Sequence, residues 1–336
     1  MKEALYYEKL DDLKVRCLLC PHHCVIGEGK SGICKVRKNV RGFLYTESYG
    51  AFSAIHLDPI EKKPLYHFYP GKMILSAGSV GCNLSCIFCQ NYEISQSGTE
   101  EFPSLQVVDP EKLALLSLRH PGNIGLAYTY NEPFISFEMI RETAPLIKRQ
   151  GQKNVMVTNG FMNPEPLGEL LPWIDAFNVD LKGFTESFYR KYTRSRLVPV
   201  LDSLKQIRKA GVHLEITNLI IPGANDDEEV FQAMVKWIAN ELGKNTVLHL
   251  SRYFPAYKLT NPPTPSETLY RFFRIARKNL NYVYVGNIEI PDTQNTYCPS
   301  CGALLIKRSG YITQIVDLDK DGFCSKCRNV IDIKIG

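Results

Sequence analysis

The sequence predicts an α/β protein whose central part is a partial (β/α) barrel, with one cysteine-rich segment before it and a small cysteine-rich domain after it. Apolar runs of strand length alternate with helical patterns, which is typical of βαβ units with parallel pairing. Polar motifs directly follow several of these runs, where the loops of a barrel carry chemistry. The 11 cysteines fall into three groups, at the start, in the middle and at the end of the chain.

The alternating elements occupy residues 71–290, and six or seven units of this kind suggest a barrel or a partial barrel. We expect strands at 72–80, 122–130, 153–160, 174–183, 212–223, 246–254 and 281–287. We expect helices at 134–150, 164–171, 198–210, 226–242 and 265–279. The chain is therefore divided into an N-terminal four-cysteine segment (1–70), the barrel (71–290) and a C-terminal four-cysteine domain (291–336).

Composition narrows the class of protein. The chain has 336 residues, of which 44% are hydrophobic and 22% charged, and its net charge of +5 is too small to argue for a nucleic-acid partner. No apolar run of about 18 residues is present, so we expect no membrane span. The first residues lack an apolar signal core, so we expect a cytoplasmic protein. In that reducing compartment, clustered cysteines indicate metal binding or catalysis rather than disulfides.

The last cysteine group predicts a structural metal site. Cys298, Cys301, Cys324 and Cys327 form two C-x2-C pairs, and this arrangement is typical of a zinc ribbon. Iron is the competing metal, as in a rubredoxin-like site, because both metals accept four thiolates in a tetrahedron.

The first cysteine group also contains four thiols. Cys17, Cys20, Cys24 and Cys34 are spaced C-x2-C-x3-C-x9-C, a pattern that suits either a zinc ion or a second iron–sulfur cluster. His22 and His23 lie within the group, and we interpret them as bystanders because four cysteines already suffice.

The middle group has only three cysteines, in VGCNLSCIFCQNY. Cys82, Cys86 and Cys89 can bind three irons of a [4Fe–4S] cluster, which leaves the fourth iron open to a small molecule. This C-x3-C-x2-C spacing resembles the signature of the radical S-adenosylmethionine (SAM) superfamily. The resemblance implies that the open iron binds the amino and carboxylate groups of SAM. It also implies that an electron from the cluster cleaves SAM to methionine and a 5′-deoxyadenosyl radical that abstracts hydrogen.

Polar residues after the later strands resemble the SAM contacts of pyruvate formate-lyase activating enzymes. The resemblance implies that Glu132 meets the SAM amino group and that other polar residues line the rest of the pocket. These cofactor-binding candidates are Asn131, Glu132, Thr158, Asn159, Asp180, Lys182, Asn218 and His249. Simpler interpretations remain open: Glu132 as a helix N-cap, Asp180 and Lys182 as a salt bridge, and His249 as a core histidine.

Further motifs resemble the radical SAM enzyme of the AmmeMemoRadiSam system along nearly the full length. They are CLLCPHHC with GICKVR, GCNLSCIFCQN, YNEP, DLKG, SRYFPAYKL, and YVYVGN before NTYCPSCG. The resemblance implies Memo-like and AMMECR-like partner proteins and an electron donor such as flavodoxin or ferredoxin. It does not imply the substrate, which is a protein or a small molecule. A glycyl-radical enzyme activase is one alternative, and a non-catalytic zinc or iron–sulfur interaction module is another.

Overall fold

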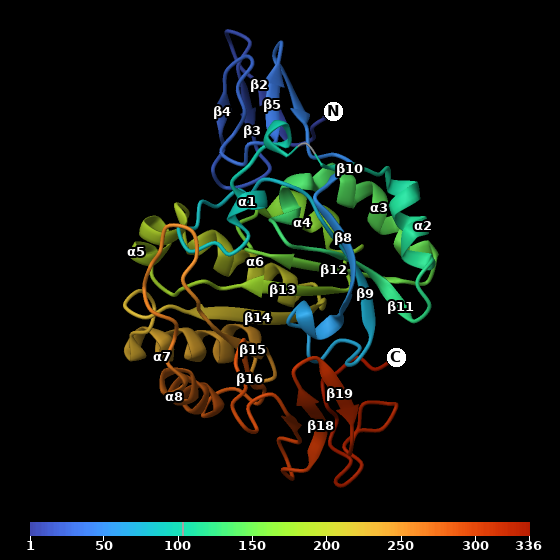
Figure 1. Ribbon diagram of the computed structural model, residues 1–336, viewed down its shortest axis with the longest axis vertical. Coiled ribbons are helices and arrows are strands. Elements are labelled where there is room, and N and C mark those ends of the chain that lie inside the picture. Colours follow the sequence, from blue (N-terminus) through green and yellow to red (C-terminus); the bar gives the residue numbers. More distant parts are fainter. Residues whose placement is uncertain (103) are drawn as a thin grey trace.

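The computed structural model describes residues 1–102 and 104–336 and has a large, mostly parallel sheet at its centre (Figure 1). The strands follow the order β16-β15-β14-β13-β12-β11-β9-β8, in which only the β8–β9 pair is antiparallel. They are β8 (Ala54–Pro59), β9 (Met73–Gly78), β11 (Asn123–Tyr128), β12 (Lys153–Thr158), β13 (Ala176–Asp180), β14 (His213–Ile220), β15 (Val247–Arg252) and β16 (Val283–Gly286). This arrangement confirms the predicted α/β class, and the edge strands of the sheet are β16 and β8.

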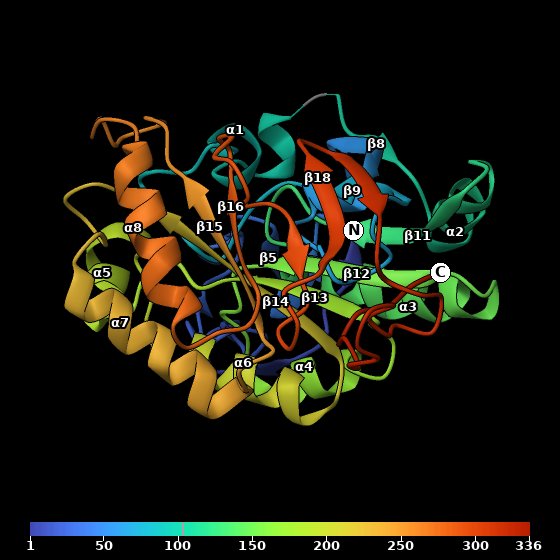
Figure 2. The same cartoon turned by 90° about the horizontal axis from the view of Figure 1, so that it is seen from below.

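Helices follow one another along the outside of the curved sheet (Figure 2). The longer ones are α2 (Pro110–Leu118), α3 (Phe137–Arg149), α4 (Pro164–Leu170), α6 (Val198–Lys209), α7 (Glu228–Trp237) and α8 (Ser266–Arg277). Short helical segments are η1 (Ile60–Lys62), α1 (Tyr92–Ser95), η2 (Thr99–Glu101), η3 (Pro133–Ser136), α5 (Glu186–Phe188), η4 (Tyr189–Thr193) and η5 (Ile238–Leu242). In the described part of the chain, no helix is long and apolar enough to cross a membrane.

Each strand and helix expected from the sequence is present, within or close to its expected range. The sequence pattern missed α2 and the edge strand β8. The sequence of β8, AIHLDP, ends on a charged residue and a proline, which is typical of a loop. Asp58 is nevertheless buried, because Lys63 donates to one of its oxygens at 2.7 Å and Lys62 to the other at 2.8 Å.

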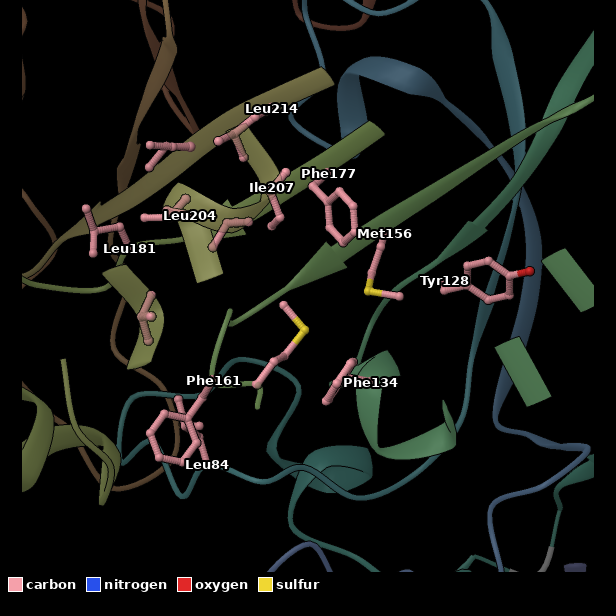
Figure 3. Packing of buried hydrophobic residues seen from close by; sticks show 14 of the residues in the cluster. Leu84, Tyr128, Phe134, Met156, Phe161, Phe177, Leu181, Leu204, Ile207 and Leu214 are labelled. Atoms are coloured by element: carbon pink, nitrogen blue, oxygen red, sulfur yellow. The ribbon is translucent and has the colours of Figure 1, made fainter. Parts of the chain in front are cut away.

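The main core lies between the sheet and its helices (Figure 3). Met156 and Phe177 project into it from adjacent strands. Leu84, from the loop that carries the middle cysteine group, lies beside Phe161, and Leu84 and Phe88 are both almost completely buried. Burying each such side chain stabilises the fold by about 1.5–3 kcal/mol. The cysteine loop is therefore fixed to the core of the domain.

Small antiparallel sheets lie at the two ends of the molecule (Figure 1). At the N-terminal end, the orders are β1-β6-β5 and β2-β3-β4, and β7 pairs with β10. At the C-terminal end the order is β17-β18-β19. Their bounds are β1 (Lys2–Glu3), β2 (Tyr7–Lys9), β3 (Val15–Cys17), β4 (Val25–Ile26), β5 (Arg37–Val40), β6 (Phe43–Thr46), β7 (Ala51–Phe52), β10 (Gln106–Val107), β17 (Thr296–Tyr297), β18 (Leu304–Ser309) and β19 (Ile312–Ile315). The boundaries proposed from the sequence stay a prediction, although β8 places part of 1–70 in the main sheet.

The C-terminal domain is joined to the main sheet by buried polar contacts. Arg308 donates to the carbonyl of Tyr66 at 2.7 Å. His67 is fully buried, and its Nδ1 lies 3.0 Å from the carbonyl of Asp332. Because a carbonyl only accepts, Nδ1 must carry the proton, and Nε2 then accepts from the Tyr284 hydroxyl at 2.7 Å. His67 is therefore held neutral between the two parts of the protein.

This contact predicts a loss of stability in acid. Burial lowers the pKa of His67 to about 4, below its ordinary value of 6.5. The unfolded chain therefore takes up a proton here before the folded protein does, and stability falls as the pH drops from 6.5 towards 4. We expect His67 to account for about 2 kcal/mol of the stability lost between pH 7 and pH 5. Urea unfolding at both pH values measures this loss. Between pH 7 and pH 5, the His67→Gln variant should lose about 2 kcal/mol less stability than the unmodified protein. An identical pH dependence in the variant would contradict the role of His67 in the loss of stability.

Candidate active site

The loop with the middle cysteine group begins at the carboxyl end of β9. Asn131 fixes its start, because its side chain accepts from the Ser79 amide at 3.0 Å and donates to the Gly81 carbonyl at 2.9 Å. Gly81 has a φ of +86°, and a Cβ at this position would lie 2.5 Å from the carbonyl oxygen of Cys34. Glycine is therefore required here both for its backbone conformation and for the close approach of the N-terminal segment.

The three cysteines that follow lie half-buried or buried in this loop. The sulfur of Cys82 accepts from the backbone amide of Leu84 at 3.3 Å and lies 3.7 Å from Nδ2 of Asn159. Among the described residues, these three sulfurs do not gather within 4.8 Å of one another, as single-ion ligands would. They therefore do not form a compact single-ion site, and three thiolates can instead bind three irons of one cluster.

Glu132 is the buried carboxylate of the site, with a residue exposure of 3%. Its Oε1 accepts from the Thr158 hydroxyl at 2.7 Å and from the Phe134 amide at 3.0 Å, and its Oε2 accepts from the Asn159 amide at 2.7 Å. Burial raises the pKa of Glu132 to about 7, although these hydrogen bonds act in the opposite direction. The N-cap interpretation is thus correct in part, because Glu132 does cap the short helix that begins at Pro133.

Asp180 and Lys182 form a salt bridge of 2.9 Å at the carboxyl end of β13. Burial alone would lower the pKa of Lys182, but its contacts with Asp180 and then with Cys86 raise it. Lys182 is therefore a cation that faces the cysteine loop. The simpler interpretation of a salt bridge is correct, and the pair also lies beside Cys86.

His249 belongs to a second buried polar network. It lies level with Asp180 across the sheet, because Asp180 pairs with Thr217 and Thr217 with His249. Its Nε2 lies 2.6 Å from Glu215, a fully buried carboxylate that also accepts from His213 at 2.9 Å. Burial alone would raise the pKa of Glu215, but these two histidines lower it well below its ordinary value. His249 is thus a hydrogen-bonded core histidine in this structure, and its contact with SAM stays a prediction.

The structure therefore brings together only part of the predicted set. The residues that surround one region at the carboxyl ends of the strands are Cys82, Cys86, Cys89, Glu132, Thr158, Asn159, Asp180 and Lys182. The amide of Asn218 instead donates to the Leu181 carbonyl at 2.6 Å, and that of Asn131 holds the cysteine loop. These two residues position backbone in this structure, and a direct contact with SAM stays a prediction for both.

Sequence reasoning missed Asn83, which lies between two of the cysteines. Its side chain accepts from Asn159 at 2.8 Å and donates to the Phe161 carbonyl at 2.8 Å. Its carbonyl accepts from Nε2 of His22 at 2.7 Å. An asparagine next to a ligand cysteine was the only signal in the sequence, and its burial and its distant partners appear only in the structure.

The C-terminal cysteines form a compact tetrad. The sulfurs of Cys298 and Cys327 are 3.6 Å apart, those of Cys301 and Cys324 are 3.7 Å apart, and all four lie within 4.8 Å of one another. A tetrahedral zinc ion with bonds of about 2.3 Å requires sulfurs about 3.8 Å apart. This group can therefore hold one metal ion.

Comparison with known proteins places the cysteine loop in a known family. A model of the radical SAM superfamily matches residues 77–235. The uncharacterized protein MJ0808 of Methanocaldococcus jannaschii is 44% identical over 336 residues, which is 99% of both chains. The pyruvate formate-lyase-activating enzyme of Listeria monocytogenes is 25% identical over 155 residues, which is 44% of this chain and 62% of that enzyme.

Among solved structures, a radical SAM methyltransferase from Sphaerobacter thermophilus has a TM-score of 0.52 and 16% identity. The match covers 65% of this chain and 67% of the methyltransferase. At this identity the likeness concerns the fold alone.

The superfamily implies a [4Fe–4S] cluster and SAM, and the residues present fit both groups. The cysteine loop offers three thiols, and the sulfur of Cys82 accepts a backbone hydrogen bond, as ligating thiolates do. Glu132 is a buried carboxylate that accepts hydrogen bonds from uncharged donors only. One of these donors is the amide of Asn159, whose side chain contacts the sulfur of Cys82. On this evidence, residues 77–235 form a radical SAM domain, and the chain is an enzyme with homology to pyruvate formate-lyase-activating enzymes.

Proposed function

We propose that this enzyme reductively cleaves SAM at a [4Fe–4S] cluster held by Cys82, Cys86 and Cys89. The observation that carries the proposal is the continuous contact from Glu132 to Asn159 and from Asn159 to Cys82. This contact links a buried carboxylate to a cluster ligand and so suits a ligand with an amino group near the cluster. When bound, the cluster supplies the electron that converts SAM to methionine and a 5′-deoxyadenosyl radical.

The protein side chains would bind and orient SAM. Glu132 accepts hydrogen bonds from uncharged donors only, so a cationic amino group would add the charge partner that it lacks. Lys182 keeps a positive charge beside Cys86, where it offsets the negative charge of the thiolates and suits a ligand carboxylate. Asp180 holds Lys182 in that position.

We further propose that the enzyme acts in an AmmeMemoRadiSam system, with a flavodoxin or ferredoxin as electron donor and with Memo-like and AMMECR-like proteins as partners. The motifs from CLLCPHHC to NTYCPSCG support this assignment along the whole chain. The hydrogen donor is then a protein or a small molecule. Activation of a glycyl-radical protein is the alternative that the Listeria relative supports.

The decisive experiment mixes the anaerobically reconstituted, dithionite-reduced protein with SAM and measures 5′-deoxyadenosine by mass spectrometry. We expect slow formation without substrate and faster formation with it. Deuterium transfer from a labelled candidate into 5′-deoxyadenosine would identify the hydrogen donor. A glycyl-radical protein as the deuterium source would favour the activase alternative. No product from protein with a complete cluster, with or without the partners, would contradict the proposal.

Replacement of Glu132 with glutamine is expected to weaken SAM binding about 10- to 150-fold, because it removes a charge-assisted hydrogen bond worth about 1.5–3 kcal/mol. Equilibrium binding of SAM to the oxidised protein measures the change. Glu142→Gln is a matched control, because Glu142 lies on α3 and contacts Lys2 and Tyr49 at the surface instead. Equal affinities in the two variants, with equal cluster absorbance, would remove Glu132 from the SAM site.

A further inference from the structure

We propose that Cys17, Cys20, Cys24 and Cys34 hold a second [4Fe–4S] cluster, bound by four thiolates and placed directly against the loop of the first. All four cysteines line one pocket. Its other walls are mainly aliphatic, and they also include Arg37 and Asn83. The sequence alone left zinc and iron–sulfur equally open for this group.

The spacing of the sulfurs separates the two metals. The C-terminal tetrad of the same chain has the narrow spacing of a single-ion site, with all four sulfurs within 4.8 Å. Among the described residues, no three sulfurs of the N-terminal group meet this limit, and the same is true of the three cysteines at the SAM-cluster loop. In a cubane cluster each thiolate binds a different iron, so its ligands stand farther apart than zinc ligands do. The N-terminal group therefore lacks the narrow spacing of the zinc-like tetrad, as the cluster loop also does.

Arg37 gives independent support for a ligand in this pocket. Its side chain is 2% exposed, and its terminal nitrogens donate to Glu138 and to the Leu5 carbonyl at 2.8 and 2.6 Å. Its Nε is buried and has no hydrogen-bond partner. Buried N–H groups are rarely left unpaired, because each costs about 1–3 kcal/mol. A sulfide or thiolate of a cluster in the pocket that Arg37 lines would accept this hydrogen bond, as in other iron–sulfur sites.

The two cysteine groups are in direct contact through the backbone. The carbonyl of Cys34 lies against Gly81, the residue before Cys82. On the other side, Asn83, the residue after Cys82, lines the N-terminal pocket and accepts a hydrogen bond from His22. Two residues that flank one ligand of the SAM cluster thus touch the second site.

This contact gives the second cluster a role as an electron relay, which rests on the proposed SAM cleavage. With a cluster bound, the four N-terminal cysteines would hold a one-electron carrier beside the Cys82 loop. A low-potential one-electron donor protein, of the iron–sulfur or flavin class, would supply the electron, and SAM cleavage at the Cys82 loop would consume it. The metal site itself does not depend on this role.

Metal analysis of the reconstituted full chain tests the site. We expect about eight irons, about eight acid-labile sulfides and about one zinc per chain. About four irons and two zinc ions would overturn the proposal. The Cys82/Cys86/Cys89→Ala variant should keep about four irons, whereas loss of all iron from this variant while it stays folded would also overturn it. Failure of the proposed function gives a different result, namely no 5′-deoxyadenosine from a protein with eight irons.

Electron paramagnetic resonance tests the contact between the clusters. The reduced Cys82/Cys86/Cys89→Ala variant should show one cluster signal that SAM does not change, because four thiolates leave no open iron. The Cys17/Cys34→Ala variant should show only the signal of the cluster at the Cys82 loop, and SAM should change this signal. In the unmodified protein, the two signals should be broadened by their mutual interaction and together account for two spins per chain. A spectrum equal to the sum of the two variant spectra would contradict direct contact. If either variant fails to fold, the broadening of the signals in the unmodified protein tests the contact, and a count of one spin per chain would contradict the second cluster.

Discussion

Replacing Cys82, Cys86 and Cys89 with alanine is expected to abolish 5′-deoxyadenosine formation and to remove about four irons per chain. The reason is that [4Fe–4S] clusters are held by thiolates, and the groups that remain beside these sulfurs are the carboxylates of Glu132 and Asp180, the amide of Asn159 and the cation of Lys182. Visible absorbance, iron content and the mass-spectrometric assay measure the effect together.

Ser85→Ala is the matched control for this variant. Ser85 lies in the same loop, and only its backbone amide, bonded to the Thr193 carbonyl at 3.0 Å, contributes a hydrogen bond in the described structure. We expect this control to keep both the cluster and the product. Full product from the cysteine variant would show that another group of the chain supports SAM cleavage.

The large sheet could be predicted from the sequence because its strands are nearly continuous apolar runs, as strands buried on both faces must be. The polar motifs could be assigned to one edge for a related reason. Glu132 and Asp180 each follow or end a parallel strand, and such ends meet at the same edge of a sheet. The edge strand β8 escaped prediction, because its buried Asp58 is compensated by lysines in the next turn and by the hydroxyl of Tyr130 from a distant segment.

The side-chain partners within the site depend on tertiary packing, and the sequence could not supply them. His249 has the same local pattern whether it faces a ligand or a carboxylate, and the structure pairs it with Glu215. The metal of the N-terminal group was undecided for a similar reason. Spacing along the chain limits which metals fit, but the distances between sulfurs depend on how β3, β4 and the connecting loops pack together.

Zinc at the C-terminal tetrad is expected to hold the last domain folded. Structural zinc in small domains contributes on the order of 10 kcal/mol to folding. The C-terminal core is small, and the buried Cys298 and Cys324 form part of it. Cys298→Ala together with Cys301→Ala should therefore release about one zinc per chain and unfold this domain. Iron content at the Cys82 loop should stay unchanged, because the tetrad shares no ligand with it.

Hydrogen exchange should show how far the unfolding caused by zinc loss extends into the protein. The amide of Tyr69 donates to the Lys334 carbonyl at 2.7 Å, so it should lose protection when the C-terminal domain unfolds. The amides of Tyr66 and His67 donate to Glu215 at 2.9 and 2.7 Å, within the main sheet, and they should stay protected. Lys326→Ala, an exposed change between two ligands, should leave all three amides unaffected. Iron in place of zinc would contradict the zinc assignment. Protection at Tyr69 in the zinc-free variant would contradict a structural role, because the domain would then fold on its hydrophobic core alone.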